Sequence, residues 1–250
     1  MEKLLSYAMD IGEQMLISGA EVRRVEEGIK RMCCSFGANR TDVFIITSSM
    51  VVTVFLPDGS FVTQTRRVVS TGTDQEKLHR LNHLLRQICE GKIEKENIGE
   101  ELKKALSRKN YPFWLECVAY SVIAGAFTLF FGGNVAEMSV SLFAGLVVRF
   151  AILLCEKTVP SKMFSKFISC AVATFISYLA VKLNIIADAD KVIIGNIMSL
   201  IPGIGLTNAL RDLFSGDSIA GLLRAVEVLL TALAIAAGYF LITILGGFLI

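Results

Sequence analysis

Polar and ionisable residues gather near the end of the chain, within and directly after an apolar stretch long enough to cross a membrane. Amides and guanidinium groups bind carboxylates, whereas Asp and Glu carboxylates carry protons or pair with the cations. Because charged groups are costly in lipid, their clustering predicts a polar pathway or the mouth of one. The cluster comprises Asn196, Thr207, Asn208, Arg211, Asp212, Asp217, Arg224 and Glu227.

Three helix-disrupting residues, Pro202, Gly203 and Gly205, lie inside the same stretch. Proline lacks a backbone donor and clashes with the preceding turn, so we expect the span to break near Pro202. A half-helix starting there would present free N–H groups and a positive dipole end, which suit a carboxylate. We interpret Asn196, Pro202, Gly203, Gly205, Thr207, Asn208 and Arg211 as candidate substrate-binding residues. We interpret Asp212, Asp217, Arg224 and Glu227 as candidate coupling or gating residues.

Simpler interpretations of these residues remain open. Pro202 could produce a plain kink, and the charged residues could anchor helix ends at the membrane interface. Asp217 is expected to cap the following helix, and Arg224 to pair with Glu227 or Asp212. Arg149, near the end of another apolar segment, is expected to extend toward the interface.

The composition divides the chain into two domains. The 250 residues are 53% hydrophobic and 19% charged, which is typical of a membrane protein. Residues 1–112 nevertheless hold 17 of the 25 Lys and Arg and 15 of the 23 Asp and Glu. We predict a cytoplasmic α+β domain over residues 1–110 and an all-α membrane domain of five transmembrane helices over residues 111–250.

The first domain is predicted to contain a helix, a three-stranded meander and two further helices. An amphipathic pattern runs from Leu4 to Cys33, and Ser18 and Glu21 resemble a capping box that restarts the helix at Gly19. The β-branched runs over residues 41–69 predict the meander, with a turn at residues 57–59. A helix capped by Thr73 or Asp74 follows over residues 75–89, and a shorter one over residues 95–107.

Five apolar segments of near-membrane length follow: residues 113–131, 137–154, 164–183, 192–210 and 219–250. Lys103, Lys104, Arg108 and Lys109 precede the first, and the later basic residues favour the same side. The sequence thus predicts a multi-pass protein of the plasma (inner) membrane, with its N-terminus in the cytoplasm and its C-terminus outside.

Other chemistry finds little support. His79 and His83 have a spacing that can bind zinc, but no third ligand stands nearby, so an ordinary solvated helix face is favoured. Cys33 and Cys34 could be redox-active, although helix packing is favoured. The chain contains no P-loop, GxSxG or HExxH motif, so we expect no enzyme activity, no metal and no cofactor. With a net charge of +2 and no basic stripe, nucleic acid is not an expected partner.

The sequence resembles the threonine/serine exporter family. The resemblance rests on Pro202-Gly203, Arg211-Asp212, Ser215-Gly216-Asp217, Gly221 and the segment 224–227. A weaker match is the opening helix over residues 18–37. Together they cover essentially the whole chain as the first half of the family's architecture, a cytoplasmic domain followed by five spans.

The resemblance implies a secondary-active exporter of small hydrophilic carboxylates, either threonine and serine or a succinate-like dicarboxylate. It also implies proton-motive coupling and places this chain as the longer subunit of a split exporter, like the succinate-export pair. The partner would be a smaller multi-span membrane protein, beside membrane lipid, and a homo-oligomer is left open. The alternative is a membrane-anchored cytoplasmic sensor or regulatory module without transport activity.

Overall fold

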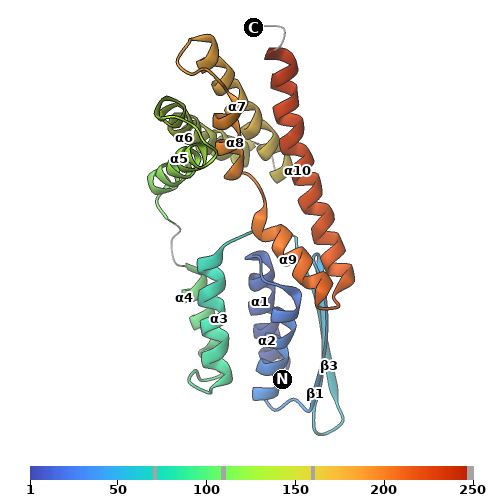
Figure 1. The fold of residues 1–250 in the computed structure, drawn as a ribbon. Coiled ribbons are helices and arrows are strands. Elements are labelled where there is room, and N and C mark those ends of the chain that lie inside the picture. The colour runs from blue at the N-terminus through green and yellow to red at the C-terminus, as the bar shows by residue number, and fades with distance from the viewer. Residues whose placement is uncertain (70–71, 108–110, 159–160, 247–250) are drawn as a thin grey trace. The chain divides into compact units, whose positions relative to one another are not determined.

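The computed structural model describes residues 1–69, 72–107, 111–158 and 161–246. Arg108 and Lys109 of the expected basic flank, and the end of the fifth expected span at residues 247–250, lie outside the described residues. The chain forms two compact units (Figure 1). The first, here called the α/β unit, comprises Met1–Lys109 and Gly203–Val226, and the second, the helical unit, comprises Asn110–Pro202 and Glu227–Ile250.

Two helices form the centre of the α/β unit: α1 (Glu2–Ile17) and α2 (Val22–Ser35). The predicted restart at Gly19 is three residues early, and the predicted capping box does not form, because Ser18 Oγ donates instead to the Gln14 carbonyl at 2.7 Å. Gly19 has φ +90°, a conformation that favours glycine, and a Cβ there would lie 2.8 Å from the Gly72 carbonyl oxygen. The glycine therefore permits the tight connection between α1 and α2.

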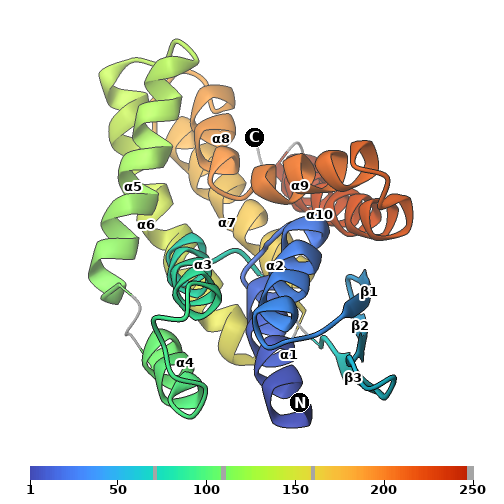
Figure 2. The same ribbon diagram turned by 90° about the horizontal axis from the view of Figure 1, so that it is seen from below.

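The predicted meander is confirmed. Strands β1 (Arg40–Ile46), β2 (Ser49–Phe55) and β3 (Phe61–Arg67) form an antiparallel sheet in the order β1-β2-β3. Side chains alternate across β2, where Met50, Val52 and Val54 are buried. The α1–α2 pair lies between the sheet and α3 (Figures 1 and 2).

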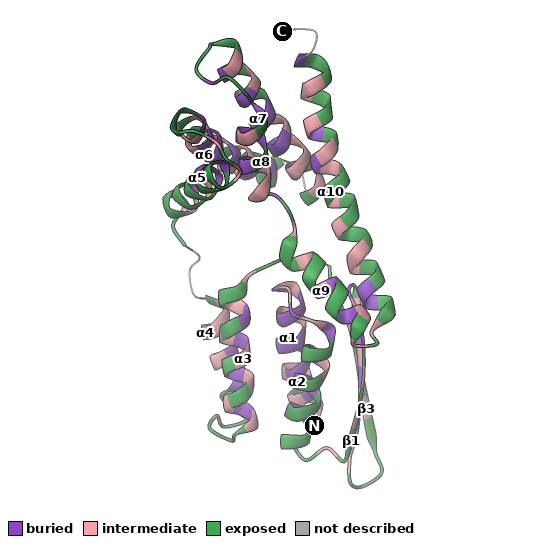
Figure 3. Ribbon diagram, viewed as in Figure 1, coloured by how far each residue is buried: buried purple, intermediate pink, exposed green. Residues whose placement is uncertain are grey.

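Helix α3 (Gln75–Cys89) has the predicted bounds, and the Asp74 carboxylate caps it by accepting from the Lys77 backbone N–H at 2.8 Å. Helix α4 (Ile98–Ser107) follows and packs on α3. Buried apolar side chains of α1, α2, the sheet, α3 and α4 form one core (Figure 3). Cys33 belongs to that core, and burial raises the pKa of its thiol to about 11, so the reactive thiolate is scarce at neutral pH.

The helical unit contains α5 (Phe113–Phe130), α6 (Val135–Thr158), α7 (Lys162–Lys182) and α8 (Asp190–Met198). Within the described residues, four helices are long and apolar enough to cross a membrane: α5, α6, α7 and α10 (Ser218–Gly246). Helix α8 and the following α9 (Gly203–Phe214) meet the same test only as a broken pair, which brings the number to as many as five. The protein is therefore a membrane protein, and the predicted break near Pro202 is confirmed.

Helices α9 and α10 do not lie wholly in the helical unit, unlike the other apolar helices. Helix α9 and the start of α10, up to Val226, pack with the α/β unit, and Ala220 joins its core. The remainder of α10 belongs to the helical unit. The α/β unit is thus assembled from two segments that are distant in the sequence.

Replacement of Gly19 by alanine should lower the melting temperature of the purified full-length chain. The positive φ costs about 1–2 kcal/mol for an alanine, and the Cβ adds a clash with a backbone carbonyl. Gly37→Ala is the matched control, because Gly37 has φ +93° but open space around its Cβ position. Thermal unfolding followed by circular dichroism should show the larger shift for Gly19→Ala, and equal shifts would contradict the clash.

Candidate functional site

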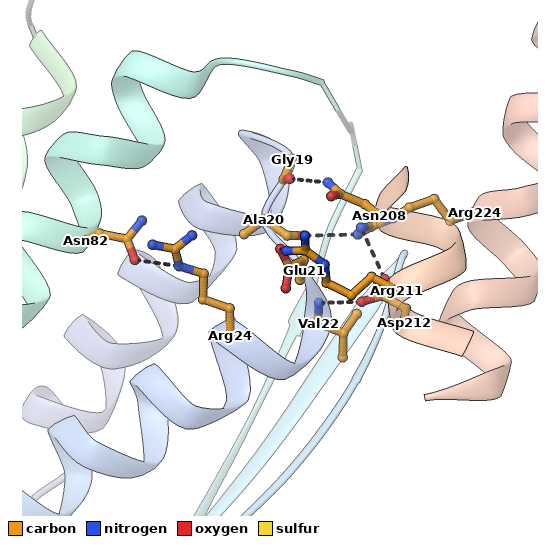
Figure 4. A network of polar contacts seen from close by, with 10 residues as sticks. All are labelled: Gly19, Ala20, Glu21, Val22, Arg24, Asn82, Asn208, Arg211, Asp212 and Arg224. Carbon is orange, nitrogen blue, oxygen red and sulfur yellow. Dashed lines mark hydrogen bonds and ion pairs between the residues drawn. The ribbon is translucent and has the colours of Figure 1, made fainter. Parts of the chain in front are cut away.

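Four of the eight residues in the polar cluster predicted from the sequence contact one turn of the α/β unit. The turn consists of Gly19–Val22, between α1 and α2, and its partners come from α9 and the first turns of α10, here called the α9–α10 hairpin (Figure 4). Four polar contacts join the two segments, and in each the two residues are about 190 to 200 positions apart in the sequence. The contacts therefore depend on the tertiary fold.

Asp212 completes the start of α2. Its Oδ1 accepts a hydrogen bond from the backbone N–H of Val22, the first residue of that helix, at 3.2 Å. The N-cap residue of α2, Glu21, provides no side-chain cap of its own. A carboxylate at a helix N-terminus satisfies a free donor and meets the positive end of the helix dipole. Asp212, only 1% exposed, thus caps a helix to which it does not belong.

Arg224 holds this carboxylate from the other side. Its Nη1 lies 3.1 Å from Asp212 Oδ2, and its Nη2 donates to the carbonyl of Ala20 at 3.1 Å. The arginine side chain is 11% exposed, so both charges are largely removed from water. A buried pair of this kind contributes modestly when intact but is costly to break, because removal of one partner leaves a buried charge.

Asn208 and Arg211 extend the same contact surface. Asn208 Nδ2 donates to the carbonyl of Gly19 at 2.8 Å, and the Arg211 guanidinium forms an ion pair with Glu21 (Figure 4). Arg211 is more than half exposed, so its ion pair is weaker than that of Arg224. Both residues were predicted to bind substrate, and in this structure both bind the turn.

The acidic residues next to the hairpin differ in their surroundings. Asp217 precedes α10 and lies near Glu26 of α2, whose pKa is raised by burial first and by the charge of Asp217 in addition. The nearby Lys30 opposes this rise of the pKa. Glu227 is exposed, and the ion pair of Arg224 is with Asp212 rather than with Glu227.

The other predicted substrate-binding residues do not join this network. Pro202 precedes α9, Gly203 begins it, and Gly205 follows within its first turn. A Cβ at Gly203 would meet no atom within 4 Å, and the exposed Thr207 hydroxyl donates to the Gly203 carbonyl at 3.0 Å. The start of α9 is therefore open, whereas its end is bound to the turn.

Asn196 lies in the helical unit within a separate polar cluster. Its Nδ2 donates to Ser141 Oγ at 3.0 Å and to the Val192 carbonyl at 2.9 Å, and Thr128 Oγ1 donates to Ser141 at 2.7 Å. Thr128, Ser141 and Asn196 are fully buried and link α5, α6 and α8. Asn196 Oδ1 has no hydrogen-bond partner, so one acceptor in the cluster is unused. Gly195 permits the close packing, because a Cβ there would lie 2.2 Å from Thr128 Oγ1.

The sequence interpretation missed an ion pair between α5 and α6. Arg149 Nε donates to Glu116 Oε2 at 2.9 Å, and its guanidinium lies 5.2 Å from the Phe113 ring centroid. Arg149 is thus held by Glu116 in the first turn of α5, and its extension toward the interface stays a prediction. Its Nη1 is buried and has no hydrogen-bond partner. The sequence did contain a signal for this pair, namely an ionisable residue in each of two apolar helices. Such residues usually mark functional positions and pair with one another.

Metal binding gains no support from the described part of the chain, which contains no group of three His, Cys, Asp or Glu side chains placed to hold an ion. His79 and His83 lie together on an exposed face of α3.

Replacement of Asp212 by alanine should strongly destabilise the α/β unit. The change removes the cap of α2 and leaves Arg224 buried without its partner, a loss of about 3–5 kcal/mol. The double variant Asp212→Leu with Arg224→Met should recover part of that loss, since it removes both charges. Thermal unfolding and limited proteolysis of the full-length chain would measure the effect.

Glu227→Ala is the control for this experiment, because Glu227 is an exposed carboxylate one turn beyond Arg224, whose ion pair is with Asp212. It should leave the melting temperature nearly unchanged. Strictly additive effects of the Asp212 and Arg224 substitutions would show that the two side chains are not energetically coupled.

Comparison with known proteins agrees with the resemblance. A family model described as "Putative threonine/serine exporter" matches residues 6–246. The "Probable succinate transporter subunit YjjP" of Klebsiella aerogenes is 26% identical over 87% of this chain and 84% of its own length. The "Probable threonine/serine exporter" of Mycobacterium tuberculosis and the "Threonine/serine exporter" of Corynebacterium glutamicum are each 24% identical over 94% of this chain.

The chain spans 45% and 50% of those two exporters, about half of their length. No solved structure matches it. Because the family model covers nearly the whole chain, this protein belongs to the threonine/serine exporter family.

Proposed function

We propose that this chain is the longer subunit of a secondary-active exporter of small hydrophilic carboxylates, acting by transport and not as an enzyme. The relative named as a transporter subunit has nearly the same extent as this chain, whereas the named exporters are about twice as long. This difference supports a split exporter, in which a smaller multi-span membrane protein supplies the other half. The substrate would be threonine, serine or a succinate-like dicarboxylate.

The incomplete pairing of Arg149 is the observation that supports a carboxylate as the substrate. A guanidinium in an apolar helix is costly unless it is paired, and Glu116 engages only its Nε and Nη2. The buried Nη1 is left as a donor without a partner. Arginine binds carboxylates through its planar fork of N–H groups, so a substrate carboxylate could complete this set of hydrogen bonds.

Asn196 is proposed as a second polar contact in the helical unit. Its amide lies in a buried cluster next to the helix break, and its Oδ1 is available as an acceptor. A free acceptor suits the ammonium or hydroxyl group of an amino acid better than a second carboxylate. Substitution at Asn196 is therefore expected to alter amino-acid transport more than dicarboxylate transport.

The α9–α10 hairpin is proposed to couple or gate transport. Asp212 and Arg224 bind the α1–α2 turn, and α9 follows directly from the break at Pro202. Movement at the break would therefore change the cap of α2. A change at the cap of α2 would likewise move the break. We assign coupling or gating to Asp212, Asp217, Arg224 and Glu227, and we propose that Asn208 and Arg211 support the same contact. We also propose the membrane orientation predicted from the basic residues, in which the N-terminus lies in the cytoplasm.

Counterflow in proteoliposomes would test the function. The chain is reconstituted with and without its smaller partner, and the uptake of labelled succinate, threonine and serine is measured. Arg149→Gln should reduce flux of the transported substrate by about 10- to 100-fold, the expected effect of losing a charged hydrogen bond of 1.5–3 kcal/mol. Arg149→Lys should retain part of the flux, since it keeps the charge.

Lys157→Gln is the matched control, because this cation is an exposed residue near the end of the same helix. Its flux should equal that of the unmodified protein. Size-exclusion chromatography would verify that each variant is folded. A folded Arg149→Gln variant with unchanged flux would eliminate Arg149 as a substrate contact, and absence of flux for all three substrates in the intact pair would contradict the proposed function.

A further inference from the structure

A cavity lies between α3 and α4 in the α/β unit, apart from the hairpin network. Its volume is about 430 Å³, large enough for a small metabolite. Helix α3 contributes His79, Arg80, His83 and Gln87 to its lining, and α4 contributes Glu101 and Lys104. The α3 residues share one helix face by their spacing, so their side chains meet at the same opening.

Arg80 is the unusual member of this lining. Its Nε and Nη1 are buried and have no hydrogen-bond partner. A guanidinium is always charged, and a buried charged donor without an acceptor is costly. No carboxylate of the described residues forms an ion pair with Arg80, so within these residues its charge has no counter-ion.

The remaining charges in the cavity favour the same ligand. Glu101 is the one carboxylate in the lining, and it is held by Lys104 with an Nζ–Oε1 distance of 2.6 Å. Lys104 therefore offsets the charge of Glu101, and Glu101 forms no ion pair with Arg80. The two imidazoles and the Gln87 amide provide further N–H donors. A metal ion is not favoured, because three suitable ligands are not grouped anywhere in the described residues.

We propose that this cavity binds a small, diffusible oxyanion, a dicarboxylate or a phosphate, through Arg80 with support from His79, His83 and Gln87. The two unpartnered guanidinium nitrogens are closed to solvent in this structure, so Arg80 would turn them toward the cavity to give the ligand charge-assisted hydrogen bonds. The site lies in the α/β unit and does not use Arg149 or Asn196, so it is independent of the proposed transport function. It would allow the α/β unit to respond to the concentration of an anion.

Isothermal titration calorimetry would test the site. The full-length chain, in nanodiscs of neutral phosphatidylcholine at constant ionic strength, is titrated separately with succinate and with inorganic phosphate. We expect saturable binding of at least one anion. Arg80→Gln should weaken it tenfold or more, and the double variant His79→Gln with His83→Gln should weaken it less.

Arg86→Gln is the matched control, because Arg86 is an exposed residue of the same helix outside the cavity lining. It should bind the anion as the unmodified chain does. Without ligand, Arg80→Gln should melt at the same or a higher temperature than the unmodified chain, since it removes a buried unpaired charge. That result would separate loss of ligand binding from loss of folding.

Three results of the titrations in neutral nanodiscs would overturn the inference. These are absence of saturable binding for both anions, equal binding by the Arg80→Gln variant, and equal weakening by Arg80→Gln and Arg86→Gln. Binding that appears only as affinity for nanodiscs containing anionic lipid would also overturn it, since the ligand would then be a headgroup. The transport variant Arg149→Gln should bind the anion normally, so failure of one proposal can be distinguished from failure of the other.

Discussion

The hydrogen bond from the Val22 backbone to the Asp212 carboxylate is the contact on which the α/β unit depends. It satisfies a free donor at the start of α2, neutralises part of the helix dipole and orients the carboxylate toward Arg224. Because α2 packs against α1, α3 and the sheet, this contact joins the α9–α10 hairpin to the centre of the unit. The α9–α10 hairpin is consequently part of the folded α/β unit, although it follows the first three apolar helices in the sequence.

Local patterns predicted local structure well. The bounds of α3, its Asp74 cap, the three-stranded meander and the break near Pro202 all follow from capping, alternation and turn residues within a few positions of one another. The capping box at Ser18 was wrong because its signal is also local, whereas the true cap lies 190 positions away. A sequence pattern read over a few neighbouring residues cannot identify a capping residue that is so distant in the chain. The pairing of Glu116 with Arg149 was missed for the same reason, since it depends on how α5 and α6 pack.

The arginines of the chain differ in how completely their donors are used. Arg224 binds both a carboxylate and a carbonyl and therefore acts as a structural residue. Arg149 and Arg80 each have buried guanidinium nitrogens without partners. A fully paired cation stabilises a fold, whereas a partly paired one retains affinity for an anion that the chain does not supply. This difference, rather than position near the helix break, separates the arginines proposed to bind ligands from those that bind the turn.

The division of the α/β unit between two distant segments has a consequence for biosynthesis. A ribosome that has completed Lys109 must still translate about 120 residues before Val226 is made, which takes roughly 6 to 24 seconds at ordinary rates of synthesis. During that interval three apolar helices emerge, and the α1–α2 turn lacks Asp212 and Arg224. Until then the N-terminal segment lacks these contacts, although residues before Lys109 supply all of its buried core except Ala220. The polar cap of α2 is thus completed only after α5, α6 and α7 have been synthesised.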